Sequence, residues 1–148
     1  MSKTYKKADQ TYIAEIHGKR KSGKSVNIAR RFGRSQYNQG GYNFPVFEAY
    51  ICLPGYEAHI RRWEKLYKRH YHDKLERNKK DYTKVTEWIK IECMDITCNH
   101  IKETMEEYVR SKNLKLRRIK KEHLQRLQED KHFIDTIRAN LEKYTDPV

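Results

Sequence analysis

Phosphate binding is the chemistry that the residue types of this chain suggest first, and the suggestion comes from the stretch Gly18–Arg34. Glycines at positions 18, 23 and 33 leave the backbone open to close approach by a ligand. The cations around them are Lys19, Arg20, Lys21, Lys24, Arg30, Arg31 and Arg34. Because backbone N–H groups and cationic side chains are the groups that hold phosphate in proteins, this stretch is predicted to contact phosphates.

Two local structures fit this stretch. In the first, Thr11–His17 and Ser25–Phe32 are the strands of a hairpin whose basic loop contacts a nucleic-acid backbone. In the second, Gly18–Ser25 is a nucleotide-binding loop, since it matches G-x-x-x-x-G-K-[ST], and Val26–Arg34 begins a helix. Both structures place a phosphate group at Lys19–Lys24.

The remainder of the chain favours the hairpin. A nucleotide-binding α/β domain needs several buried parallel strands that read as continuous apolar runs, and such runs are almost missing here. The nearest match to an apolar strand that ends in a metal-binding Asp is Ile89–Asp95, whose charges indicate a helix instead. A P-loop-type nucleotide-dependent enzyme that uses Gly18–Ser25 therefore stays as an alternative.

The composition indicates a polyanionic partner. The chain has 148 residues and a formal net charge of +13, with cations in greatest excess over residues 1–34 and 59–80. DNA, RNA and an acidic membrane surface are the partners that such charge attracts. Neither an apolar run of about 20 residues nor a signal peptide is visible, so no membrane association is predicted. Three cysteines without a secretory signal are expected to be reduced thiols in a cytoplasmic protein.

The predicted fold class is α+β and mainly helical, with a small N-terminal antiparallel sheet or hairpin packed on about three long antiparallel helices. Residues 1–10 are expected to be a basic flexible arm, and residues 11–148 a single domain. Within it, residues 11–54 are the small β region with the basic loop, and residues 55–148 are the helical region.

Three series of apolar residues at intervals of three or four define the predicted helices. The first runs from Tyr56 to Leu75, the second from Val85 to Tyr108 and the third from Leu116 to Tyr144. Asp81 or Thr83 is expected to cap the second helix. Five cations lie off the apolar stripe of the first helix and are predicted to extend the phosphate-binding surface: Arg61, Arg62, Lys65, Lys68 and Arg69.

Aromatic residues divide into two groups. Trp63 and Trp88 fall on apolar helical stripes and are predicted to anchor the core. Tyr37 and Tyr42 lie in a glycine-rich loop beside arginines, where they either stack on unpaired bases or cover the sheet. The sequence leaves both roles for these two tyrosines open.

Catalytic and metal sites are not predicted. Cys93, Cys98 and His100 are spaced by five and two positions, which diverge on a helix instead of sharing a face. For the same reason His70 and His72 are not expected to act as an acid–base pair on one phosphate.

The predicted function is non-catalytic binding of nucleic acid through the basic loop and the basic helix face, with RNA favoured over DNA because of the loop tyrosines. The predicted contacts are Lys19, Arg20, Lys21, Lys24, Arg30, Arg31, Arg34, Tyr37, Tyr42, Arg61, Arg62, Lys65, Lys68 and Arg69. No cofactor or metal is predicted. The other alternative is a small inhibitor or adaptor that binds an acidic protein surface.

Overall fold

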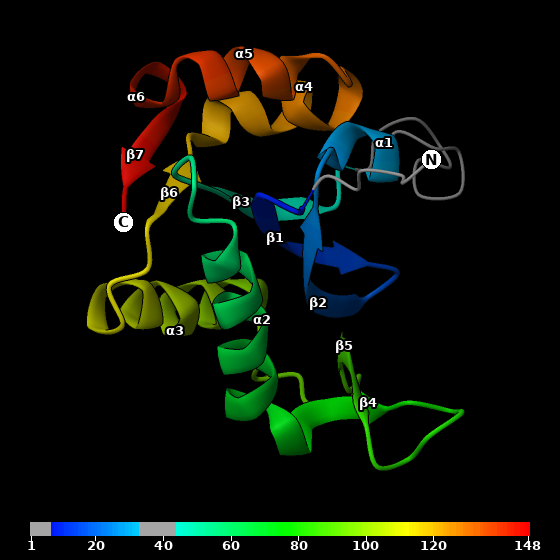
Figure 1. Cartoon of the computed structure of the whole chain (residues 1–148). Helices are drawn as coiled ribbons and strands as arrows, with labels where there is room; N and C mark the ends of the chain where they lie inside the picture. Colours follow the sequence, from blue (N-terminus) through cyan, green and yellow to red (C-terminus); the bar gives the residue numbers. More distant parts are fainter. Residues whose placement is uncertain (1–6, 33–43) are drawn as a thin grey trace, which may run out of the picture.

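A seven-stranded antiparallel sheet forms the centre of the protein in the computed structural model, which describes residues 7–32 and 44–148 (Figure 1). The strands are β1 (Gln10–Ile16), β2 (Lys19–Ser25), β3 (Val46–Cys52), β4 (Leu75–Arg77), β5 (Val85–Ile89), β6 (Leu116–Ile119) and β7 (Thr145–Pro147). Their order across the sheet is β4-β5-β2-β1-β3-β6-β7, and every pairing is antiparallel.

Helices cover both faces of this sheet. The helices are α1 (Ile28–Phe32), α2 (Ala58–His70), α3 (Cys98–Ser111), α4 (Leu124–Glu129), α5 (Phe133–Ala139) and α6 (Leu141–Tyr144), with short 3₁₀ turns η1 (His72–Lys74) and η2 (Lys121–His123). α2 and α3 lie on one face, and α1, α4, α5 and α6 lie on the other (Figure 1). The strands therefore bury side chains on both sides: Tyr50 of β3 packs towards α2 and α3, while Ile51 packs towards the opposite helices.

A two-residue turn joins β1 and β2. His17 and Gly18 have positive φ angles of 52° and 78°, the conformation that a tight antiparallel hairpin of this length requires. Gly23 has a different role, because it lies opposite Tyr12 in the register and a side chain at position 23 would overlap the tyrosine ring. Packing against Tyr12 therefore accounts for this glycine.

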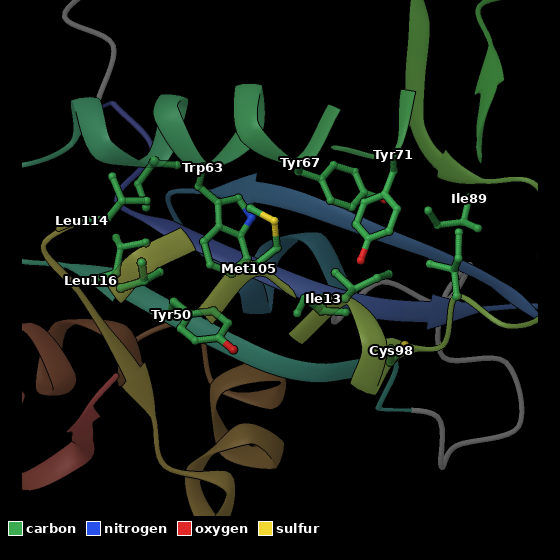
Figure 2. Close-up of a cluster of buried hydrophobic side chains, with 14 of the residues drawn as sticks. Ile13, Tyr50, Trp63, Tyr67, Tyr71, Ile89, Cys98, Met105, Leu114 and Leu116 are labelled. Carbon is green, nitrogen blue, oxygen red and sulfur yellow. The ribbon is translucent and has the colours of Figure 1, made fainter. Parts of the chain in front are cut away.

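Trp63 is the largest fully buried side chain on the face covered by α2 (Figure 2). Its side chain is 1% exposed, its ring centroid lies 4.9 Å from that of Tyr50, and its Nε1 donates to Ser22 Oγ at 2.8 Å. The indole thus joins α2 to β2 and β3. The prediction that Trp63 anchors the core is confirmed.

The mainly helical fold class is wrong. α2 is present where the first long helix is predicted, but the second predicted helix contains β5 before α3 begins, and the third is divided among β6, η2, α4, α5 and α6. Residues 55–148 therefore include four strands of the main sheet. The expected three long antiparallel helices do not form.

The physical reason is that a sheet covered on both faces produces apolar spacings that resemble those of a helix. Leu116 and Ile119 are three positions apart, and β6 buries them on opposite faces of the sheet. In β5 the residues Val85, Thr86, Trp88 and Ile89 are β-branched or aromatic, which favours a strand. Trp88 is therefore half-buried on a strand and not on a helix.

The predicted hairpin with a basic loop is also wrong in its local structure. Lys19–Ser25 is itself the second strand and pairs along its whole length with β1. Residues 28–32 form α1, whose start is fixed by Asn27, because its Oδ1 accepts the backbone N–H of Arg30 at 3.2 Å. Ser25 Oγ accepts the backbone N–H of Asn27 at 3.0 Å. The residues that match the nucleotide-loop pattern thus form no phosphate-binding loop.

Asp81 and Thr83 cap no helix but stabilise the turn between β4 and β5. In the ranges 7–32 and 44–148 no helix is long and apolar enough to cross a membrane. Arg34, Tyr37 and Tyr42 lie outside the described residues, as do the first six residues of the predicted arm.

Candidate nucleic-acid interface

The lysines of β2 point towards carboxylates from later parts of the chain. Lys19 Nζ lies 2.9 Å from Glu76 Oε1, Lys21 Nζ lies 3.3 Å from Glu87 Oε2, and Lys24 Nζ lies 3.3 Å from Glu64 Oε1. The three acids belong to β4, β5 and α2. These ion pairs join β2 to the elements around it and offset the positive charge of the strand.

Arg20 is 6% exposed and bonded to backbone carbonyls. Its guanidinium donates to the carbonyl oxygens of Cys93 at 3.2 Å, Met94 at 3.5 Å and Ile96. All three bonds come from Nη1 and converge on one turn, in which the Cys93 carbonyl also accepts the backbone N–H of Ile96 at 3.2 Å. Arg20 therefore holds the connection between β5 and α3 against β2.

Lys21 is similarly enclosed, at 8% exposure. Its Nζ lies 4.9 Å from the ring centroid of Trp88 and 5.9 Å from that of Tyr12, in addition to the ion pair with Glu87. A lysine between two aromatic faces and a carboxylate has little surface left for a phosphate. The roles of Arg20 and Lys21 as phosphate contacts stay predictions, and the enclosed positions of both side chains place them outside the candidate interface.

The outer face of α2 is different. Arg61, Arg62, Lys65 and Arg69 are exposed and Lys68 is half-buried. At about 100° per residue these five side chains fall within about 120° of the helix circumference, opposite the buried Ile60, Trp63 and Tyr67. Among the described residues none of the five cations has an ion-pair partner. We call these five residues the α2 cationic face.

A shallow hollow of about 300 Å³ lies at the N-terminal end of this face. Its lining includes Lys7, Lys24 and Arg61, together with Glu57 and Ile60. Lys24 is still partly exposed beside Glu64, so the hollow joins the end of β2 to the α2 cationic face. The structure thus brings Lys24 of the predicted loop close to the predicted helix face.

Arg30 and Arg31 are exposed but lie elsewhere. They belong to α1, whose Ile28 and Phe32 pack with the helices on the opposite side of the sheet from α2. The surface predicted as one continuous basic patch is thus divided between two layers. Arg34, Tyr37 and Tyr42 cannot be assigned to either layer, since they lie outside the described residues.

A buried cluster of charged residues lies between α3 and the sheet. Glu106 accepts from Arg118 Nη2 at 2.5 Å and from Tyr50 Oη at 2.6 Å. Burial tends to raise the pKa of Glu106, but the hydrogen bonds from Arg118 and Tyr50 outweigh it and hold the pKa below its usual value. Burial raises the pKa of Glu48, although Lys102 lies 3.5 Å away and opposes the change. The side chains of Glu48 and Glu106 are both buried, so this cluster lies inside the fold and presents no surface to a ligand.

Side chains with metal-binding chemistry do not converge within residues 7–32 and 44–148, where no group of three or more His, Cys, Asp and Glu residues is suited to a metal ion. Cys98 is buried at the start of α3, and burial raises the pKa of its thiol to about 11. His70 lies 3.2 Å from Tyr108 Oη, and burial lowers the pKa of its imidazole. These residues pack at the junction of α2 and α3.

Sequence reasoning missed one exposed element, the β4–β5 hairpin, because its residues were assigned to the end of the first predicted helix and to the cap and first turns of the second. The available signal was a turn-forming stretch, Asn78–Thr83, between two short runs that are compatible with strands.

No protein-family model, curated protein or solved structure matches this chain.

Proposed function

We propose that this protein binds nucleic acid through its phosphate backbone, and that the α2 cationic face is the principal contact surface. The observation that carries the proposal is the absence, within the described residues, of any carboxylate partner for Arg61, Arg62, Lys65, Lys68 and Arg69. Cations without an internal partner keep their full attraction for an external polyanion.

The shape of the face supports the same function. α2 has 13 residues and is therefore about 20 Å long, so its cations form a row that several consecutive phosphates can follow. The apolar side of α2 is buried against the sheet, which fixes the direction of the cationic side. Binding of this kind requires no change in the fold, and it discriminates little between sequences because phosphate contacts carry no base information.

The test is fluorescence anisotropy with labelled single-stranded RNA, single-stranded DNA and duplex DNA, between about 50 and 200 mM salt. The test variant is Arg62→Glu/Lys65→Glu, and the matched control is Lys131→Glu/Lys143→Glu, which changes the net charge equally. Lys131 and Lys143 are exposed, and they lie on the opposite side of the sheet from α2.

We expect the α2 double variant to lose at least about tenfold in affinity and to show a smaller salt dependence, since two phosphate contacts are lost. The control should lose much less. Equal losses in the two variants would mean that only net charge matters and would contradict the assignment to α2. Absence of nucleic-acid binding by the unaltered protein would contradict the proposed function itself and would favour an acidic protein surface as the partner.

A further inference from the structure

The hairpin of β4 and β5 carries an exposed tyrosine at its tip. Tyr82 is 74% exposed, and the hairpin extends from the C-terminal end of α2, away from the helices on the other side of the sheet (Figure 1). An aromatic ring with so much free surface contributes little to the fold. It is therefore available to a partner.

Hydrogen bonds hold this tip in one conformation. The backbone N–H of Asn78 donates to the Lys84 carbonyl at 2.9 Å, and that of Lys84 donates to the Asp81 carbonyl at 3.0 Å. Asn78 Oδ1 accepts the N–H of Lys80 at 2.9 Å, and Asp81 Oδ1 accepts from Thr83 N at 3.1 Å and from Thr83 Oγ1 at 2.6 Å. An ordered tip presents Tyr82 with little loss of conformational entropy on binding.

The charge around Tyr82 is positive. Lys79, Lys80 and Lys84 are exposed and have no ion-pair partner within the part of the chain that the structure describes. Asp81 is the one acid of the tip, and its hydrogen bonds from Thr83 lower its pKa, so it stays ionised as part of the turn. The tip therefore combines one aromatic face with three cations.

The hairpin is anchored to α2, through the C-terminal end of the helix and through its buried side. α2 leads through η1 directly into β4, and Tyr67 Oη of α2 donates to the Glu87 carbonyl of β5 at 2.7 Å. A strand whose phosphates follow α2 beyond Arg69 therefore approaches the hairpin next. The connection keeps the tip at a defined position relative to the helix.

We propose that Tyr82 stacks on an unpaired base of a single-stranded segment whose phosphates contact Lys79, Lys80 and Lys84. This inference rests on the proposed function and adds the substrate class, single-stranded nucleic acid. Stacking on an aromatic ring needs a base whose face is free, and a base inside a duplex has both faces covered by its neighbours. The aromatic ring supplies stacking energy, and the lysines neutralise the backbone on either side.

The other strongly exposed apolar residues do not fit a nucleic acid. Met94 is 78% exposed and Ile91 is also exposed, but they lie beside the acidic Glu92 and Asp95 in the connection between β5 and α3. Carboxylates there would repel phosphates. Tyr56 is less exposed, at 41%, and its ring lies 5.0 Å from that of His59. Within the described residues Tyr82 is thus the most exposed aromatic residue, and its surroundings match a polyanion.

The experiment compares the unaltered protein with Tyr82→Ala and Tyr82→Phe, using labelled oligo(U) and oligo(dT) of about 15 nucleotides and a duplex of equal length. Tyr82→Phe is the matched control, since it keeps the ring and removes only the hydroxyl group. Circular dichroism checks that each variant is folded.

We expect Tyr82→Ala to weaken single-strand binding by about fivefold or more, to leave duplex binding nearly unchanged, and to leave the salt dependence unaltered, because a tyrosine releases no counterions. Tyr82→Phe should bind like the unaltered protein. A strand with one 2-aminopurine should lose fluorescence on binding by stacking, and Tyr82→Ala should remove part of that loss.

Three results would overturn the inference, and they are distinguishable. If Arg62→Glu/Lys65→Glu weakens binding while Tyr82→Ala binds single strands as tightly as the unaltered protein, the stacking role is wrong and the proposed function stands. If the unaltered protein binds none of the probes, both proposals fail. An equal loss on single strands and duplex in Tyr82→Ala would also contradict base stacking.

Discussion

β2 and α2 carry similar numbers of cations in the sequence, yet the structure uses them differently. In β2, Lys19, Lys21 and Lys24 pair with carboxylates, and Arg20 is enclosed by backbone carbonyls. On α2, the five cations of the α2 cationic face point to solvent without ion-pair partners in the described residues. Positive charge in a sequence is therefore not the same as positive charge available to a ligand.

The difference arises from position in the sheet. β2 lies between β1 and β5, so its side chains are surrounded by other parts of the protein. Removing water from their charges costs free energy unless polar groups nearby compensate. α2 lies on the outside of a layer, so one side of the helix is buried and the other is solvated. The cations of β2 contribute to folding, and those of α2 are free for association.

The largest expected effect is on stability, and it comes from replacing Trp63, the residue that joins α2 to β2. Trp63→Ala removes a buried indole that contacts Tyr50 and donates to Ser22 of β2, so it should lower the free energy of unfolding by about 3–5 kcal/mol. Urea denaturation measures the loss, and Trp63→Phe should retain part of the stability. A fully stable Trp63→Ala protein without nucleic-acid affinity would show that Trp63 faces the ligand.

A smaller loss of stability is expected from Arg20. Arg20→Met keeps an apolar stem but removes the donors to the carbonyls of Cys93, Met94 and Ile96, which should cost about 2 kcal/mol or more in unfolding free energy. Thermal denaturation checks this, and Arg62→Met on α2 is the matched control with an expected change within about 0.5 kcal/mol. Unchanged stability in Arg20→Met would contradict the distinction between cations of β2 that stabilise the fold and cations of α2 that do not.

The effect of the buried carboxyl group of Glu48 on stability can be tested by varying the pH. Because burial raises the pKa of Glu48 in the folded protein, its ionisation opposes folding as the pH rises above the value for an unfolded glutamate. Glu48→Gln should therefore gain stability relative to the unaltered protein at neutral pH, and the gain should disappear at about pH 3, below the unfolded glutamate pKa, where Glu48 is protonated in both states.

For Glu106 the expected change of stability with pH has the opposite sign. Its pKa is lowered in the folded protein, since hydrogen bonds from Arg118 and Tyr50 outweigh the effect of burial, so its contribution is present at neutral pH and is lost as the pH falls. Glu106→Gln should thus destabilise at neutral pH. Thermal denaturation between about pH 2 and 7 covers the range below the unfolded glutamate value of about 4.3, where the contribution of Glu106 is lost, and it distinguishes the two variants. Parallel pH profiles would contradict the assignment of opposite shifts.

The smallest expected effect is the change in the salt dependence of binding when a single cation is replaced. Arg62→Ala should reduce the slope of log K against log[salt] by about 0.7–0.9, the value for one phosphate contact, with almost no change in stability. Lys19→Ala, which removes a lysine paired with Glu76, should leave the slope nearly unchanged. Equal changes in slope for the two variants would contradict the distinction between paired and unpaired cations.

Some properties follow from the sequence because they depend on neighbours along the chain. The apolar spacing of Ile60, Trp63 and Tyr67 predicted both α2 and the side of it that is buried, and the same spacing placed the α2 cationic face opposite. The strand character of residues 11–16 was also predictable, since β1 (Gln10–Ile16) matches it within one residue. The class of partner inferred from the net charge remains a prediction.

Other properties were decided only by the tertiary structure, because they depend on residues far apart in the chain. The partners of β2 are Glu64, Glu76 and Glu87, and nothing local in residues 19–25 indicates that these acids return to it. A strand buried on both faces also has no single apolar period, so β6 was predicted as part of a helix. The exposure of Tyr82 depends on the β4–β5 pairing, and β5 in turn pairs with β2 at Trp88 and Lys21, which lie 67 positions apart in the chain.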